Sequence, residues 1–230
     1  MATLADLPAR IAARGPRPAL VRRCREDGFR DWSATDVIEA ARHGAAGLLA
    51  IGLAAGDRLA IVCESRPEWL LVDLAAQTIG VITVPVYPTL PAPQVRHILA
   101  DSGARVAVVS DRIQAAKVQE VRHLLPALEL VVVIDAGPAD DTDPHAGHFG
   151  LGTSVIAHAA LLARGRDRLA TDPSVAAAIE ARRAAVAEDS VATIIYTSGT
   201  TVISVGEAVR RSRAIVSRFS AKTIVRPDIR

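Results

Sequence analysis

The chain has 230 residues, of which 50% are hydrophobic and 23% are charged, so it is long enough to bury the core of one or two globular domains. Arginine supplies nearly all of the positive charge, because Lys117 and Lys222 are the only lysines. The formal net charge of +2 at pH 7 gives no basic footprint for a nucleic acid, so we expect no nucleic-acid partner.

The two cysteines and the N-terminus indicate the compartment. Cys24 and Cys63 are too few for a disulfide framework and lack metal-ligand spacing, which favours a reducing environment. Asp6 and the early prolines argue against an organellar transit peptide. The longest apolar run, residues 48–55, is far shorter than the roughly 18 residues that cross a bilayer. We therefore expect a cytoplasmic protein without a transmembrane segment.

The first predicted elements are two short strands, at residues 18–23 and 29–32. Between them lies Asp27-Gly28, the dipeptide best suited to the positive φ angles of a tight turn. The sequence therefore predicts an N-terminal β-hairpin.

A helix is predicted directly after this hairpin. Ser33 and Asp36 have the spacing of a capping box, and Gly52 ends the apolar pattern. The apolar positions fall on one stripe of the helix: Val37, Ala41, Ala45, Leu48 and Ile51. This helix should pack one face onto a core and carry no chemistry.

From residue 59 onward, strands and helices alternate. Apolar strand candidates begin 22 to 24 residues apart, with a helical stretch in each gap, at Leu59, Val81, Arg105 and Glu129. This spacing predicts parallel strands, because parallel neighbours need a long crossover connection. Right-handed crossovers then give a doubly wound α/β sheet with helices on both faces.

The three intervening helices have recognisable ends. The first begins at Pro67 and stops at Gly80. The second begins near Pro91 and stops at Gly103. The third is predicted over residues 111–125 and ends before a proline.

Residues 140–148 form a polar stretch whose aspartates and histidines could ligate a metal by residue type alone. They are crowded around proline and glycine, as in an exposed loop, so we assign no metal site there. Alanine-rich helices are predicted next, at residues 154–168 and 174–187. The histidines are scattered and no Ser-His-Asp or Cys-His arrangement follows from spacing, so we name no catalytic residue.

The most informative stretch follows a short strand predicted at residues 191–195, which is rich in β-branched residues. The small residues after it offer hydroxyl groups and unobstructed backbone N–H groups, which can line a site for a phosphate chain. These candidate nucleotide-binding residues are Thr197, Ser198, Gly199, Thr200 and Thr201. An ordinary turn is the alternative, and no Gly-Lys-Ser/Thr follows that would make a Walker A loop.

The order Tyr-Thr-Ser-Gly-Thr-Thr at residues 196–201 resembles the phosphate loop of the adenylate-forming enzymes, which include the AMP-forming acyl-CoA synthetases. In that family the loop continues as Gly-x-Pro-Lys-Gly. Here residues 202–206 are Val-Ile-Ser-Val-Gly, so the first half of the motif is present and its lysine is absent.

The preceding part of the chain resembles the same family. The matching segments are Gly-Asp-Arg-Leu-Ala-Ile at 56–61, Pro-Glu-Trp at 67–69, Val-Pro-Val-Tyr-Pro-Thr at 84–89 and Ile-Leu-Ala-Asp-Ser-Gly-Ala at 98–104. Their order and spacing are similar to those of the first subdomain of long-chain fatty-acyl-CoA synthetases. The resemblance covers about residues 4–201, and none of these segments supplies a catalytic candidate.

The resemblance implies a fold and a chemistry. The expected fold is an N-terminal hairpin and helix plus a doubly wound parallel sheet, the first subdomain of an adenylate-forming enzyme, with an incomplete second sheet. The expected reaction is adenylation of a fatty acid by ATP with Mg²⁺, followed by transfer of the acyl group to CoA. Catalysis would rest on positioning and charge neutralisation, without a protein nucleophile.

Most of the family's active site follows the phosphate loop, and 29 residues follow Thr201 here. We therefore interpret the chain as the N-terminal fragment of a long-chain fatty-acid–CoA ligase that is inactive as it stands. Two alternatives stay open. One is a non-catalytic α/β binding or interaction module, and the other is one half of a split enzyme that a complementing chain completes.

The resemblance also divides the chain into four regions. They are an N-terminal α/β subdomain (1–135), a loop and helices (136–190), the strand and phosphate loop (191–201) and a basic tail (202–230). The tail has seven Lys and Arg against Glu207 and Asp228, and we expect it to be sequence joined by a frameshift, rearrangement or early end of the gene. A nucleic-acid or membrane arm is the alternative. The strand at 191–195 would then lack partners and expose its edge, so residues 1–135 should behave better alone.

Overall fold

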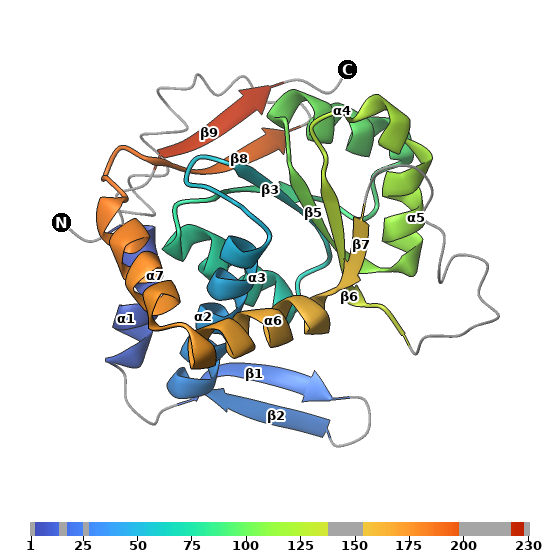
Figure 1. Cartoon of the computed structure of the whole chain (residues 1–230). Helices are drawn as coiled ribbons and strands as arrows, with labels where there is room; N and C mark the ends of the chain where they lie inside the picture. The colour runs from blue at the N-terminus through green and yellow to red at the C-terminus, as the bar shows by residue number, and fades with distance from the viewer. Residues whose placement is uncertain (1–2, 14–17, 25–27, 138–153, 198–221, 228–230) are drawn as a thin grey trace.

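The computed structural model describes residues 3–13, 18–24, 28–137, 154–197 and 222–227. This part of the chain contains a two-stranded antiparallel hairpin and a seven-stranded parallel sheet (Figure 1). None of the helices in these ranges is long and apolar enough to span a membrane. The protein has the α/β fold that the sequence predicts.

The N-terminal region contains two short helical segments and the hairpin. These elements are η1 (Leu4–Asp6), α1 (Leu7–Ala12), β1 (Pro18–Cys24) and β2 (Gly28–Ser33). β1 and β2 pair in antiparallel fashion, which confirms the predicted hairpin, although Asp27 of its turn lies outside the described residues. The Asp6 carboxylate pairs with Arg183, so the N-terminus is tied to a residue 177 positions later.

The helix α2 (Ala34–Ala50) begins at the predicted capping box. The Ser33 backbone N–H donates to Asp36 Oδ2 at 2.8 Å, and the Asp36 backbone N–H donates to Ser33 Oγ at 3.2 Å. These bonds satisfy backbone groups that the first turn of a helix leaves without partners. Four members of the predicted stripe are buried and Ile51 is half-buried; the four are Val37, Ala41, Ala45 and Leu48.

The large sheet contains seven strands that run parallel. They are β3 (Arg58–Val62), β4 (Ile82–Val86), β5 (Val106–Asp111), β6 (Leu130–Asp135), β7 (Ser154–Ala157), β8 (Val191–Thr197) and β9 (Lys222–Pro227). Their order across the sheet is β7-β6-β5-β3-β4-β8-β9. The starts predicted for the strands now labelled β3, β4, β5 and β6 each lie within one residue of the observed start.

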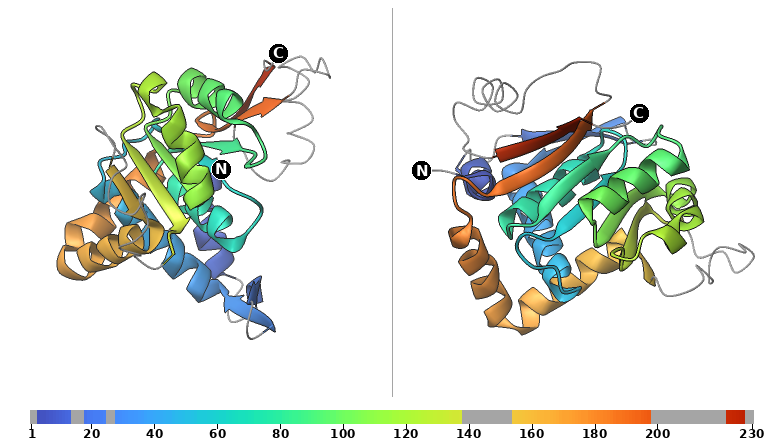
Figure 2. Two further views of the ribbon diagram at one scale, coloured as in Figure 1. Left: turned by 90° about the vertical axis from the view of Figure 1, so that its right-hand side faces the viewer. Right: turned by 90° about the horizontal axis from the view of Figure 1, so that it is seen from above.

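Five further helices connect these strands. They are α3 (Pro67–Thr78), α4 (Ala92–Ser102), α5 (Arg112–Glu120), α6 (His158–Thr171) and α7 (Pro173–Ala185). α2, α3, α6 and α7 cover one face of the sheet, and α4 and α5 cover the other (Figure 2). Alternate side chains of β3 serve the two faces: Leu59 and Ile61 pack toward α3, while Ala60 and Val62 pack toward α4. This arrangement confirms the doubly wound sheet.

The helix predicted at residues 154–168 is wrong at its start. Residues 154–157 form β7, which pairs with β6 in parallel, and α6 begins only at His158. Val155 lies opposite Val131 in this pairing. The β-branched side chains of the short segment fit a pleated sheet, so tertiary pairing outweighs the helical tendency of the alanine-rich sequence that follows.

The helix predicted at residues 111–125 is shorter than expected. α5 ends at Glu120, and a separate 3₁₀ turn, η2 (Arg122–Leu124), follows it. Leu125 has φ −121° and ψ 72°, outside the helical region. This conformation is typical of a residue before proline, whose ring disfavours a helical conformation at the preceding position.

The strand β8 is not the unpaired strand that the sequence analysis predicts. It lies between β4 and β9 and pairs with both in parallel. β9 comes from the basic tail and covers the edge of β8 that we expected to be exposed. Thr223, Ile224 and Val225 give β9 the β-branched composition that suits a strand. β8 therefore extends the first sheet, and the described residues contain no second parallel sheet.

The helices α2 and α6 cross at very short range. A Cβ atom on Gly165 would lie 2.0 Å from the carbonyl oxygen of His43, and one on Gly47 would lie 2.6 Å from the carbonyl oxygen of Leu161. Glycine alone permits this approach, because it carries no side chain. The crossing fixes the position of α6, which begins with a buried histidine.

Candidate functional site

The strand β8 brings the start of the predicted phosphate loop to the carboxyl edge of the sheet. All strands of the sheet are parallel, so their carboxyl ends lie at one edge, where open α/β sheets bind ligands. β8 ends at Thr197, the first of the five candidate residues. Ser198, Gly199, Thr200 and Thr201 lie outside the described residues, so their role stays a prediction.

Tyr196, the residue before Thr197, is fixed to α4. Its ring is 7% exposed, and its hydroxyl donates to Asp101 Oδ2 at 2.6 Å. The ring also contacts His97 in an edge-to-face geometry, with ring centroids 6.5 Å apart and an interplanar angle of 80°. The end of β8 is therefore held by one hydrogen bond to a carboxylate and one aromatic contact.

A buried polar cluster holds β8 from the other face of the sheet. Gln77 Nε2, on α3, donates to the carbonyl oxygen of Ala192 at 2.9 Å and to Thr83 Oγ1 at 3.3 Å. Thr193 Oγ1 donates to the carbonyl oxygen of Thr83 at 3.0 Å. Burial raises the pKa of the Asp73 carboxyl group, against the opposing influence of the Thr83 and Gln77 side chains.

A network of charged side chains lies at the same edge, after β3. Arg66 donates to the two carboxylate oxygens of Asp135 at 2.7 and 3.1 Å and to Glu68 at 2.8 Å. This network joins the carboxyl ends of β3 and β6. Burial raises the pKa of the neighbouring Cys63 thiol to about 12, so the thiol is protonated at neutral pH and is not a nucleophile.

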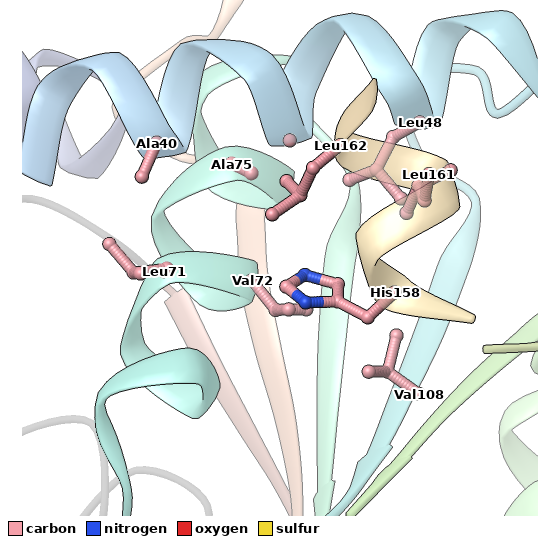
Figure 3. A pocket seen from close by; sticks show the side chains of 10 residues that line it. Ala40, Leu48, Leu71, Val72, Ala75, Val108, His158, Leu161 and Leu162 are labelled. Carbon is pink, nitrogen blue, oxygen red and sulfur yellow. The ribbon is translucent and has the colours of Figure 1, made fainter. Parts of the chain in front are cut away.

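The first residue of α6, His158, lines a small apolar cavity between α2, α3 and α6 (Figure 3). Its side chain is 7% exposed and lies beside Val72 and Leu161. Burial lowers the pKa of its imidazole, and Arg66 lowers it further against the opposing influence of Glu68. His158 is therefore neutral near pH 7 and serves packing.

The described residues contain no group of three or more His, Cys, Asp and Glu side chains that could hold a metal ion. The polar stretch at residues 140–148 lies outside them.

The sequence analysis missed the two residues that tie β8 to the helices, Gln77 and Asp101. Their hydrogen bonds span 115 and 95 residues, so no local pattern reveals them. One feature of the sequence could have indicated that β8 has such partners. Thr193 is a polar residue inside an apolar strand, and such a residue needs a hydrogen-bond partner when it is buried.

Comparison with known proteins identifies the kind of protein that this fold and loop belong to. A family model described as AMP-binding enzyme matches residues 7–202. The match includes the whole segment that resembles the phosphate loop and ends at the start of the basic tail.

Curated relatives include fatty-acid–CoA ligases. The long-chain-fatty-acid–CoA ligase FadD15 of Mycobacterium bovis is 36% identical over 175 residues, which are 74% of this chain and 25% of the relative. The long-chain-fatty-acid–CoA ligase heimdall of Drosophila melanogaster is 28% identical over 54% of this chain and 18% of the relative. The chain thus spans about a quarter or less of the length of these relatives.

Solved structures with the same fold include two adenylation domains of carboxylic acid reductases. The domain from Mycobacterium chelonae has a TM-score of 0.62 and 23% identity, over 72% of this chain and 29% of that chain. The domain from Segniliparus rugosus, in complex with AMP and a co-purified carboxylic acid, has a TM-score of 0.60 and 19% identity, over 71% of this chain and 30% of that chain. These likenesses confirm the expected fold.

Proposed function

The chain belongs to the AMP-binding enzyme family, and from this membership we propose that it supplies the N-terminal subdomain and the phosphate loop of an AMP-forming long-chain fatty-acid–CoA ligase. One observation carries the proposal. β8 lies inside a parallel sheet and ends at the carboxyl edge, at the residue where the predicted loop Thr197–Thr201 begins. This is the place where an α/β sheet presents backbone N–H groups and hydroxyls to a phosphate chain.

In the proposed reaction the carboxylate of a fatty acid attacks the α-phosphorus of ATP. The products of this step are an acyl-adenylate and pyrophosphate, and the thiol of CoA then displaces AMP. The contribution of this chain is to hold the phosphates in place, because positioning and charge neutralisation dominate such reactions. The protonated thiol of Cys63 is consistent with a mechanism that uses no protein nucleophile.

ATP, fatty acid and CoA are the proposed small-molecule partners, with Mg²⁺ to neutralise the triphosphate. The hydroxyls of residues 197–201 suit phosphate oxygens, and the triphosphate itself would supply oxygen ligands for the metal. The remaining contacts to the nucleotide and the acyl chain need the rest of an adenylation domain. We therefore propose that these 230 residues alone do not complete the reaction.

The four regions predicted from the sequence are retained as a proposal, with one addition. The basic tail at 202–230 lies beyond the family match, yet it contributes β9 to the sheet. Its origin by a frameshift or rearrangement stays a prediction, which the DNA that follows the codon for Thr201 tests in all frames.

A second candidate function is one half of a split ligase. Ile113, at the start of α5 and at the same edge as Thr197, is 73% exposed. The strands β3 and β4 lie between β5 and β8, so Ile113 shares the edge of the sheet with Thr197 without adjoining it. Exposed apolar surface at this edge is where a second protein segment would pack. ATP–pyrophosphate exchange that appears only after a second chain is added would support this candidate, whereas a non-catalytic module would bind its partner without any exchange.

The primary test is binding of a fluorescent ATP analogue to the full chain. We expect measurable affinity that falls about tenfold on Thr200→Val, because the proposed hydrogen bond to a charged phosphate would be lost. Thr171→Val is the matched control, since the Thr171 hydroxyl donates to the carbonyl oxygen of Asp167 on exposed α6. Equal affinity of both variants would overturn the proposed role of the loop. ATP–pyrophosphate exchange with a fatty acid by the chain alone would overturn the proposed inactivity.

A further inference from the structure

We propose that Gln77 and Asp101 are positioning residues that hold β8 from opposite faces of the sheet and so set the place of the strand that carries the phosphate loop. The effect on ATP rests on the proposed function of that loop. The effect on the position of β8 does not depend on that function.

The strand β8 has six residue pairs with the edge strand β9, but its backbone pairing with β4, which joins it to the rest of the sheet, is sparse and needs such support. β3 and β4 have five residue pairs, from Arg58↔Ile82 to Val62↔Val86. β4 and β8 have one, Thr83↔Thr193. A regular parallel ladder fixes a strand through evenly spaced backbone hydrogen bonds. At the β4–β8 junction side chains supply much of that function.

On the α3 face, Gln77 bridges the two strands. Its amide is 7% exposed and donates both to the backbone of β8, at Ala192, and to the side chain of β4, at Thr83. Both acceptors lie on strands, so the amide of Gln77 links β4 to β8 directly. Loss of either acceptor would leave a buried amide hydrogen of Gln77 without a partner, which costs more than the same loss at an exposed site.

On the α4 face, Asp101 holds the other end of the strand. The Tyr196 hydroxyl donates to its carboxylate at 2.6 Å, and bonds to a carboxylate are stronger than bonds between neutral groups. Ala192 and Tyr196 are four residues apart, which is roughly 13 Å along a strand. Two ties at that separation oppose both sliding and tilting of β8, since a slip of one residue would break each of them.

The test is hydrogen exchange of the full chain, read by mass spectrometry in residues 191–197 and in β3. Gln77→Met and Tyr196→Phe each remove hydrogen bonds with little change in shape. We expect exchange in 191–197 to accelerate roughly three- to tenfold in each variant while β3 is unchanged. The two sites are separate, so the effects should multiply in the double variant.

Two matched controls define the background. Gln119→Met removes an amide whose nitrogen has no hydrogen-bond partner among the described residues, and Tyr87→Phe removes a hydroxyl from a side chain that is 73% exposed. Neither should change exchange in 191–197. A further pair of variants separates loss of one hydrogen bond from loss of folding. Thr193→Val removes the hydrogen bond to the Thr83 carbonyl oxygen, whereas Thr193→Ser retains it.

The same variants are then tested for affinity to the fluorescent ATP analogue. Weaker binding in Gln77→Met and Tyr196→Phe, with recovery in Thr193→Ser relative to Thr193→Val, supports a positioning role that a general loss of stability would not produce. Unchanged exchange in both variants, or an equal rise in the controls or in β3, overturns the proposal. Faster exchange in the two variants, together with no ATP binding by the wild-type chain, would refute the proposed function and leave the positioning of β8 supported.

Discussion

The strands β3 and β8 are both buried members of one parallel sheet, yet they are held in place by different means. β3 pairs along its length with β4 and with β5, and its side chains enter apolar cores on both faces. β8 has six residue pairs with the edge strand β9 but a single pair with β4, so its attachment to the rest of the sheet relies on side chains from α3 and α4. A backbone ladder fixes a strand for almost any sequence. Side-chain contacts can be altered one hydrogen bond at a time, which suits a strand that carries a proposed phosphate-binding loop.

The largest loss of folding stability is expected when a buried side chain of β3 is shortened. Ile61 is fully buried in β3, whereas Ile195 of β8 is 37% exposed. Ile61→Ala should cost about 2–5 kcal/mol, because it leaves a cavity that the packed sheet cannot close. Ile195→Ala should cost only about 1–2 kcal/mol, because its partly open surroundings can relax. Urea unfolding measures both, and equal costs would contradict the contrast between the strands.

The packing that supports β3 can be broken from the helix side. Gly165→Ala should cost about 3 kcal/mol, because the added methyl group meets the backbone of His43 and forces α6 away from α2. Ala159→Ser, at an exposed position of the same helix, is the control. Thermal unfolding gives the comparison. A Gly165→Ala protein as stable as the control would show that α2 and α6 separate freely.

A smaller effect on the same side of the molecule should depend on pH. Burial lowers the pKa of His158 in the folded protein, so the folded state binds fewer protons than the unfolded state, where the pKa is about 6.5. Stability contributed by neutral His158 is therefore complete above about pH 6.5 and declines as the pH falls toward the folded pKa. Unfolding free energies at pH 7.5, 6.5 and 5.5 should decline more steeply for the wild type than for His158→Gln. Parallel curves would exclude a contribution from this imidazole.

The smallest effect is expected far from both strands. Ser33→Ala removes the capping bond at the start of α2 and should cost about 1 kcal/mol. Ser33→Thr retains a hydroxyl and should recover most of the loss. Urea denaturation checks both variants, and an equally unstable Ser33→Thr protein would point to a cause other than the cap. Neither variant should change hydrogen exchange in β8 relative to β3.

Local chemistry in the sequence predicts the central half of the fold well. The starts of β3 and β4 follow from apolar runs that end at turn residues, and the start of α2 follows from Ser33 and Asp36 alone. Each of these signals involves residues only a few positions apart, so it can be recognised from the sequence alone. Ser154–Ala157 is different, because four residues become a strand only through pairing with β6.

The candidate site could be predicted only in part. The hydroxyl-rich run that begins at Thr197 is visible in the sequence, and the family resemblance gives it a meaning. The ties of Gln77 to Ala192 and of Asp101 to Tyr196 are invisible there, because each joins elements about a hundred residues apart. The pairing of β9 with β8 was missed for the same reason, since nothing in residues 222–227 indicates which strand they join.

The buried thiol of Cys63, directly after β3, can report the rate at which the central sheet opens. Alkylating reagents attack the thiolate, and Cys63 is 5% exposed with a pKa raised to about 12, so it is unreactive while β3 stays closed. Once Cys24 is replaced by serine, consumption of the remaining thiol records each opening of this part of the sheet. The opening rate then follows from the consumption of an alkylating reagent, with no label attached to the protein beforehand.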